Sequence, residues 1–346
     1  MNQIYNPKVS IIIIGYNIES YLDKCLESVF HQTYTNYEAI FVNDGSQDGT
    51  IHVAKKYSEK YGLHIIDKQN GGIVSARKAG LAYATGEYVA FVDGDDWLNN
   101  HMVTSLVDAL DKGMRDADIV CSNFNWQTEE GDFIVQTNKV DRIGHGNLSF
   151  FSGIMSNDID HHMFPKLYRR QFLIDCGYAE YLNVTMAEDL MTNALLGLHN
   201  PQVVYSTDVN YFYRYNTSSV IRKGNKKLLE QIDTLRYMQQ KIEKTVYNED
   251  IRRLMEYQWF SYAMGYIKRP GDFDIKQRIF YESKKHFGDI EHNQYVQQEM
   301  KETQGRYVRL FYSYHRHEMI AQIHDKVLFS LLAIYKSIRR RVRRNK

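Results

Sequence analysis

The sequence predicts an α/β protein with a doubly wound, mostly parallel sheet, followed by a helical C-terminal region. Two observations support this fold class. Over the first hundred residues, apolar runs typical of strands buried on both faces alternate with stretches of helical periodicity. Beyond about residue 225 the strand pattern ends, and the chain becomes helical and rich in Tyr, Lys and Arg. We therefore expect two domains, residues 1–224 and residues 225–346.

The expected elements of the first domain follow one another in strand–helix order. The strands cover residues 9–14, 38–44, 63–67, 87–93 and 117–124. Helical spacing marks residues 22–30, with Asn17 as the expected N-cap, and then residues 48–60, 73–84 and 98–110. The mixed composition of residues 125–145, which include Gly131 and Gly144, predicts short strands and loops. This alternation predicts a parallel sheet, and such sheets bind ligands beyond the C-terminal ends of their strands.

Composition excludes several classes of protein. A formal net charge of +1 over 346 residues gives no field that would attract nucleic acid. The three cysteines, at 25, 121 and 176, show neither metal-ligand spacing nor a disulfide framework, as expected in a reducing compartment. The start of the chain has no signal-peptide core, and the apolar run at 327–335 is shorter than the ~20 residues that cross a bilayer. We expect a cytoplasmic protein.

Polar residues follow three of the expected strands. Tyr16 and Asn17 end the first, Asp44 ends the second, and the stretch FVDGDDW at 91–97 ends the fourth. Because parallel strands end at one edge of a sheet, these residues are expected to meet there. The carboxylates of FVDGDDW are compatible with a solvated turn or with a site for Mn²⁺ or Mg²⁺. The spacing alone leaves both interpretations open.

Other nucleotide and metal motifs are missing from the sequence. An EF-hand that began at Asp93 would need Glu where the chain has Thr104. No P-loop, no GxGxxG after the first strand and no GxSxG occur.

Three segments in series, VSIIIIGYN, FVNDGSQDGT and NGGIVSARKAGLAYATGEYVAFVDGDDWL, resemble the N-terminal half of a family 2 glycosyltransferase with the GT-A fold. The resemblance is dense from residue 8 to about 100. It continues more thinly through FPKLYRRQFL, AEDLMTN and YFYRYNTSSV to about residue 221. It implies inverting transfer of a sugar from a UDP-sugar to a hydroxyl, with Mn²⁺ or Mg²⁺ as cofactor.

The resemblance assigns the base-binding residues individually. It implies that Tyr16 and Asn17 contact the uracil, and that Asp44 accepts a hydrogen bond from the base. The family usually has proline where this chain has Gly15.

The same resemblance assigns residues around the diphosphate and the sugar. Arg77 resembles the residue that leans on the nucleotide, with Asn70 nearby. Asp93 would bind the ribose or the sugar, and Asp96 would touch the donor sugar or orient the acceptor. Asp95 would hold the metal. A carboxylate-held dication neutralises the charge that develops on a diphosphate leaving group, so the assignment is chemically coherent.

The stretch VTMAEDLMTNALLGL contains the expected general base. Thr185 and Glu188 have the spacing of a capping box at the start of an amphipathic helix, which leaves Asp189 without a structural role. The resemblance also indicates Asp189 as the base, with Glu188 at the substrate. The alternative is that both acids are favoured in the first turn by the helix dipole.

Further candidates have weaker patterns. In YFYRYNTSSV, Arg214 is expected at the diphosphate and Ser219 is expected to add a hydroxyl, unless this is a tyrosine-rich strand. Lys166 is a minor candidate. His161 and His162 are more typical of packing than of metal ligation, and Trp97 is more typical of packing than of stacking on the acceptor.

The C-terminal region suggests partners rather than chemistry. Residues 336–346 contain seven basic residues and no acid, directly after the apolar run. This pattern is typical of a segment that lies on anionic lipid, and equally of a frayed basic tail. The tyrosine-rich helices between 225 and 325 could bind the acceptor or pair two chains.

We therefore expect a metal-dependent, inverting glycosyltransferase of cell-surface polysaccharide synthesis, on the inner face of the membrane, with a glycan or lipid-linked glycan acceptor. A sugar-nucleotide nucleotidyltransferase is one alternative, but it would need a Gly-rich phosphate loop where this chain has IGYNIES. A non-catalytic, nucleotide-sugar-binding scaffold is another alternative, and it would be expected to lose the acids that this chain keeps.

Overall fold

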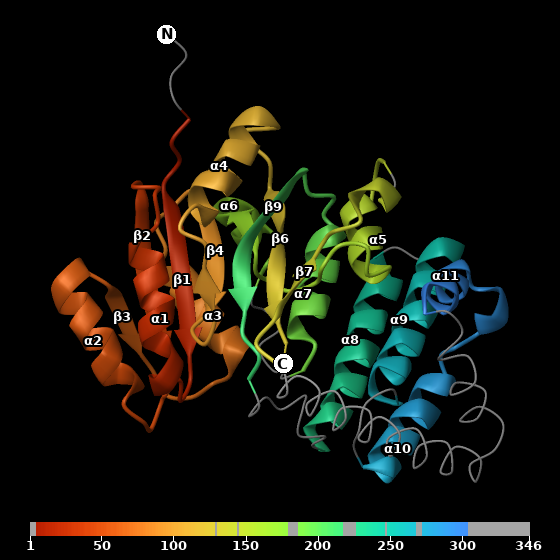
Figure 1. Ribbon diagram of the computed structural model, residues 1–346. Coiled ribbons are helices and arrows are strands. Elements are labelled where there is room, and N and C mark those ends of the chain that lie inside the picture. Colours follow the sequence, from red (N-terminus) through yellow and green to blue (C-terminus); the bar gives the residue numbers. More distant parts are fainter. Residues whose placement is uncertain are drawn as a thin grey trace, which may run out of the picture. The chain divides into compact units, whose positions relative to one another are not determined.

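The computed structural model describes residues 5–128, 130–143, 145–178, 186–216, 226–245, 248–267 and 272–303 (Figure 1). The chain divides into two compact units between Thr217 and Ser218. The boundary expected after residue 224 lies outside the described residues.

The first four strands of the N-terminal unit form the predicted parallel sheet. They are β1 (Val9–Gly15), β2 (Tyr37–Asn43), β3 (His64–Asp67) and β4 (Tyr88–Asp93), in the order β3-β2-β1-β4. The helices between them are α1 (Glu19–Phe30), α2 (Thr50–Tyr61) and α3 (Ile73–Tyr83). As the apolar run predicted, β1 is buried on both faces. The strand order reverses between β1 and β4, which is where sheets of this kind bind ligands.

The sheet continues through antiparallel pairs. Beyond β4 lie β8 (Lys166–Arg169), β6 (Ile119–Gln127), β9 (Val203–Tyr213) and β5 (Trp97–Leu98), and β7 (Phe133–Gln136) pairs with β6. Because β8 runs antiparallel to both β4 and β6, and β9 is parallel to β6, β9 points the same way as β4. The C-terminal end of β9 therefore reaches the edge where β1, β2 and β4 end.

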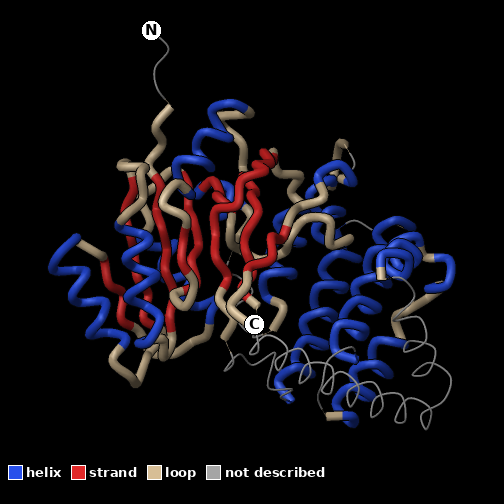
Figure 2. Tube along the Cα trace, viewed as in Figure 1, coloured by secondary structure: helices blue, strands red, loops and turns tan. Residues whose placement is uncertain are grey.

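Helices lie against both faces of this sheet (Figure 2). Besides α1 to α3, the helical elements of this unit are α4 (Met102–Lys112), η1 (Val140–Arg142), α5 (Ser149–Met155), α6 (Arg170–Asp175) and α7 (Glu188–Gly197). A core of β1, α1, β4 and α4 side chains fills one face, whereas on the other face Ile12 of β1 lies against Gly80 of α3.

Two expected boundaries in this unit were wrong. The helix expected over residues 98–110 starts only at Met102, because residues 97–98 form β5, which pairs with β9. Asn17 is not an N-cap, because α1 begins at Glu19 and is preceded by Ile18. Asn17 instead adopts a positive φ of 52° in the turn before the helix.

The C-terminal unit is helical, as predicted. It contains η2 (Lys226–Leu229), α8 (Glu230–Thr245), α9 (Glu249–Ile267), α10 (Phe273–Lys284), η3 (Ile290–His292) and α11 (Gln294–Glu302). Helix α9 is buried over much of its surface and carries the fully buried Trp259. Within the described residues, no helix combines the length and apolar character needed to span a bilayer.

Candidate active site

Asp44 anchors the loop between β3 and α3. It is 4% exposed, and its carboxylate accepts hydrogen bonds from the backbone N–H of Gly71 at 3.0 Å and of Gly72 at 2.8 Å. The ammonium of Lys68 completes this set at 2.6 Å. The next residue, Gly45, has a φ of 78°, and a Cβ there would meet the backbone of Asn70 at 2.7 Å. The Asp-Gly pair therefore brings the predicted residues Asp44 and Asn70 together.

The loop after β1 lies beside the loop after β2. The backbone N–H of Asn17 donates to Ser46 Oγ at 3.0 Å, and the side-chain oxygen of Asn17 accepts from Gln47 N at 2.8 Å. The N–H of Asp44 donates to the carbonyl of Gly15 at 2.9 Å. Tyr16 is 47% exposed at this edge. The three predicted base-binding residues therefore lie on adjoining loops with one aromatic ring open to solvent.

Arg77 joins acids from β4 and α7. It is 2% exposed, its Nη1 donates to Asp189 Oδ1 at 2.5 Å, and its Nη2 lies 3.4 Å from Asp93 Oδ1. The second oxygen of Asp189 accepts from Met163 N at 3.3 Å. Charge-assisted bonds to guanidinium are among the strongest in proteins, so this arrangement fixes the position of Asp189.

Burial and charge act in opposite directions on these acids. Burial by itself would raise the pKa of Asp189, but Arg77, with a further contribution from His162, outweighs it and lowers that pKa. Burial raises the pKa of Asp93 to about 6, although Arg77 opposes the shift. Asp189 is therefore ionised at neutral pH, the state in which a carboxylate can accept a proton.

Glu188 begins helix α7. The helix is preceded by Ala187, which has a φ of 59°, so the predicted capping box is wrong: Glu188 stands at the first helical position. Thr185 lies outside the described residues. Burial, together with the neighbouring Asp189 carboxylate, raises the pKa of Glu188 to about 7. Both acids lie in the first turn, where the helix dipole favours negative charge.

Asp96 ties the end of β4 to β9. It has no exposed surface, and its two oxygens accept from the hydroxyl of Tyr211 at 2.7 Å and from the N–H of Arg214 at 2.8 Å. Burial and the nearby acids Asp95 and Asp93 raise the pKa of Asp96. These contacts give Asp96 a structural role, and its predicted contact with substrate stays a prediction.

Asp95 is the predicted metal-binding residue of this cluster and, unlike Asp96, is not fully buried. It is half-buried, its Oδ2 accepts from Asn216 at 3.3 Å, and its carbonyl accepts from Arg214 Nε at 2.5 Å. Among the described residues, no three His, Cys, Asp or Glu side chains converge as a metal site. A single carboxylate fits Mg²⁺ or Mn²⁺, because such ions are commonly held by one or two carboxylates, waters and substrate phosphates.

Two cations lie over the ring of Trp97, beside Asp95. The Lys24 ammonium lies 3.4 Å from the ring centroid and the Arg214 guanidinium 4.6 Å from it. Trp97 also stacks on Phe212 at 5.3 Å. Sequence reasoning missed Lys24, because its position on α1 carries no signal that it lies beside Trp97. Ser219 lies outside the described residues, and Lys166 donates to backbone carbonyls rather than facing the acids.

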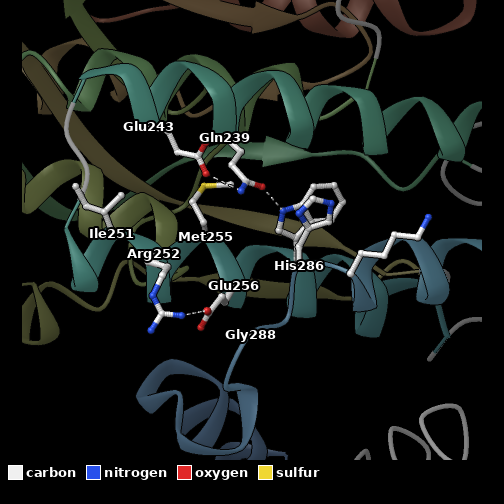
Figure 3. A pocket seen from close by; sticks show the side chains of 10 residues that line it. Gln239, Glu243, Ile251, Arg252, Met255, Glu256, His286 and Gly288 are labelled. Atoms are coloured by element: carbon white, nitrogen blue, oxygen red, sulfur yellow. Dashed lines mark hydrogen bonds and ion pairs between the residues drawn. The ribbon is translucent and has the colours of Figure 1, made fainter.

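The C-terminal unit contains a separate cavity of about 220 Å³, shown in Figure 3. Its polar side chains bond to one another: Trp259 donates to Gln239 at 2.9 Å, Gln239 donates to Glu243 at 2.8 Å, and Arg252 pairs with Glu256. These polar side chains of the cavity are therefore paired with one another rather than open to a ligand. We assign the candidate active site to the N-terminal unit.

Comparison with known proteins identifies the family. Residues 10–176 match the model for glycosyl transferase family 2. The chain is 30% identical over 306 residues to glycosyltransferase GlyA of Streptococcus pneumoniae, covering 80% of this chain and 42% of GlyA. It is 32% identical over 235 residues to the uncharacterized glycosyltransferase YibD of Escherichia coli, covering 64% of this chain and 66% of YibD. The chain thus spans less than two thirds of each of these two relatives.

A solved structure shows the same fold. The crystal structure of S. aureus TarS 1–349 in complex with UDP-GlcNAc matches with a TM-score of 0.59 at 18% identity, covering 87% of this chain and 93% of that one. This similarity confirms the predicted fold class, and the sequence matches confirm the predicted family. The chain has the GT-A fold and belongs to the family 2 glycosyltransferases.

Proposed function

We propose that the protein is an inverting glycosyltransferase that moves a hexosyl or N-acetylhexosaminyl group from a UDP-sugar to a hydroxyl of a glycan or lipid-linked glycan in cell-surface polysaccharide synthesis. The observation that carries this proposal is the buried bridge from Arg77 to Asp189 and Asp93. It holds an ionised carboxylate at the sheet edge where the nucleotide-binding candidates also lie. The UDP-GlcNAc bound by TarS supports UDP as the nucleotide.

The donor binds along the loops that follow β1 and β2. The uracil lies against Tyr16 and Asn17, and Asp44 accepts a hydrogen bond from the base. Asp95 would hold Mn²⁺ or Mg²⁺, which when bound neutralises charge on the diphosphate. Arg214, fixed by its bond to the Asp95 carbonyl, adds a guanidinium to the same leaving group.

Asp189 takes the proton from the acceptor hydroxyl as that oxygen attacks the anomeric carbon from the side opposite to the diphosphate. Arg77 keeps the carboxylate ionised and oriented, the state in which it can accept a proton. Glu188, at the start of the same helix, hydrogen-bonds to the sugar. Asp93 lies on the donor side of Arg77 and binds the ribose or the sugar.

The C-terminal basic segment would keep the enzyme near a lipid-linked acceptor. Seven cations in residues 336–346 attract anionic lipid at roughly 1 kcal/mol each near the surface. Deletion of residues 337–346 should release the protein from vesicles that contain phosphatidylserine, but should not affect donor affinity. Undiminished co-sedimentation of the shortened protein would remove this part of the proposal.

Calorimetric titration with a panel of nucleotide-sugars, first with Mn²⁺ and then with EDTA, tests the proposed function. We expect one UDP-sugar to bind in a metal-dependent way, and Asp95→Asn to abolish that dependence. The surface variant Asp175→Asn is the matched control and should bind as wild type. Equal donor affinity with Mn²⁺ and with EDTA would remove the metal assignment, and no binding of any nucleotide-sugar would remove the proposed function.

A further inference from the structure

An aspartate–histidine pair lies in the loop before β8. Asp160 Oδ1 accepts from His162 Nδ1 at 2.7 Å and from the backbone N–H of the same residue at 2.9 Å. Lys166 donates to the carbonyls of Asp160 at 2.8 Å and of His162 at 2.5 Å. The N–H of Asp160 donates to Asn138 at 2.8 Å. These contacts fix the loop and the tautomer of the imidazole, since Nδ1 carries the proton that faces Asp160.

The ring of His162 stacks on two other rings, and within the described part of the chain its Nδ1, but not its Nε2, makes a hydrogen bond. It stacks on Phe164 and on His161, each with centroids 4.8 Å apart. Among the residues that the structure describes, no hydrogen-bond partner faces Nε2, and the side chain is 30% exposed. A histidine oriented through Nδ1 with Nε2 open is the arrangement that presents a hydrogen-bonding atom to a ligand.

His162 lies next to the proposed base. The following residue, Met163, donates its N–H to Asp189 Oδ2 at 3.3 Å. The charge of His162 contributes to lowering the pKa values of both Asp189 and Asp93. Burial opposes protonation of His162, but Asp160 outweighs it and raises the pKa of His162 above its ordinary value.

We propose that His162, oriented by Asp160, binds the acceptor sugar through Nε2, at a hydroxyl adjacent to the one that Asp189 deprotonates. This inference rests on the proposed function, because it gives the Asp189 site its acceptor side. The ligand class is a polyhydroxyl compound. One hydroxyl bonds to the carboxylate and its neighbour bonds to the imidazole, so that the attacking oxygen is held in one orientation.

A pair of substitutions separates this role from a purely structural one. The amide of His162→Asn reproduces the Nδ1 bond to Asp160 but has no atom at Nε2. The amide of His162→Gln reaches the position of Nε2 but cannot bond to Asp160 in the same way. His52→Asn, an exposed histidine on α2, is the matched control.

The probe is a UDP-sugar with a panel of free hexoses as acceptors, since a hexose carries the neighbouring hydroxyl that water lacks. The rate measured is UDP release in the presence of hexose minus its release in water alone. We expect His162→Asn to fold and to bind the donor as wild type, but to release UDP at least about tenfold more slowly. His162→Gln should retain more of the rate than His162→Asn, and His52→Asn should retain all of it.

Three results would overturn the inference. The first is that wild type and His162→Asn release UDP at the same rate and bind the donor equally well. The second is that His162→Asn loses donor affinity and rate by the same factor, and the third is that His162→Gln is slower than His162→Asn. Failure of the proposed function gives a different result. In that case the wild-type protein itself would bind no nucleotide-sugar in the calorimeter.

Discussion

Arg77 and Asp189 are 112 residues apart in the sequence and form a buried ion pair, with Asp93 as a second carboxylate on the same guanidinium. Substitution of Arg77 by Met would leave both acids buried without their cation. We expect a loss of about 3–5 kcal/mol in the free energy of unfolding at pH 7, measured by urea denaturation. Arg115→Met, which breaks an exposed pair with Asp111, should cost less than about 1 kcal/mol.

The pH dependence of that loss tests its cause. In the wild type the pKa of Asp189 is lowered, so the pair stabilises the fold above the ordinary pKa of an aspartate, and this stabilisation disappears as the pH falls. The difference between wild type and Arg77→Met should therefore persist down to about pH 4 and shrink below it, as the pH falls through the lowered pKa of Asp189. A difference that is the same at pH 7 and at about pH 3 would show that packing, rather than charge, accounts for the loss.

Asp189→Asn tests the proposed base. The amide oxygen can still accept the bond from Arg77 but cannot take a proton, so turnover should fall by about 10²–10⁴-fold while donor affinity stays within roughly twofold. Turnover is measured as UDP release and affinity by calorimetry. Asp175→Asn, on the surface of α6, should change neither quantity. Near-normal turnover in Asp189→Asn would remove this residue as the base.

Trp97 positions the cations beside Asp95, so its removal should weaken donor binding. A cation over an aromatic face contributes about 0.5–2 kcal/mol, which predicts a loss in donor affinity of roughly 2–30-fold for Trp97→Leu. Lys24→Met should produce a smaller part of the same loss. Lys60, which lies over the ring of Tyr61 away from the acids, supplies the control Lys60→Met. If Trp97→Leu binds the donor as wild type, the ring has only a packing role.

Glu188 should make the stability of the protein depend on pH. Its pKa in the folded state is about 7, above the ordinary value of a glutamate, so folding takes up a proton between about pH 4.5 and pH 7. Stability contributed by the protonated form is present at low pH and lost as the pH rises through 7.

Glu188→Gln should therefore melt at the same temperature as wild type near pH 4.5 and at a higher temperature than wild type above pH 7. Glu87→Gln, an exposed glutamate, is the control. A shift in melting temperature that is independent of pH would contradict the raised pKa of Glu188.

That the candidate donor residues meet at one sheet edge could be predicted from the sequence, because Tyr16, Asn17 and Asp44 directly follow strands and Asp93 ends one. Asp44 and Asp93 lie at one edge by virtue of parallel strand order alone, and that order follows from the alternation of strands and helices. The positions of Tyr16 and Asn17 follow from the same rule.

The base side could not be predicted in the same way. The pairing of Arg77 with Asp189 depends on where α7 packs, which no local periodicity encodes. The start of α7 at Glu188 was missed because Ala187 adopts a positive φ, which residues with a Cβ rarely do. Residues 97–98 form a strand only because β9 lies beside them. In each case a tertiary contact overrides local propensity.

The family match ends at residue 176, yet Asp189 and the end of β9 lie beyond it. The ion pair to Arg77 and the bonds from β9 to Asp96 therefore fasten a later stretch of chain onto an earlier one. Under the proposed function, this arrangement would let the later stretch, and with it the choice of acceptor, vary while the stretch proposed to bind the nucleotide stays the same. Exchange of residues 177–216 between relatives is then the change expected to alter which glycan is extended.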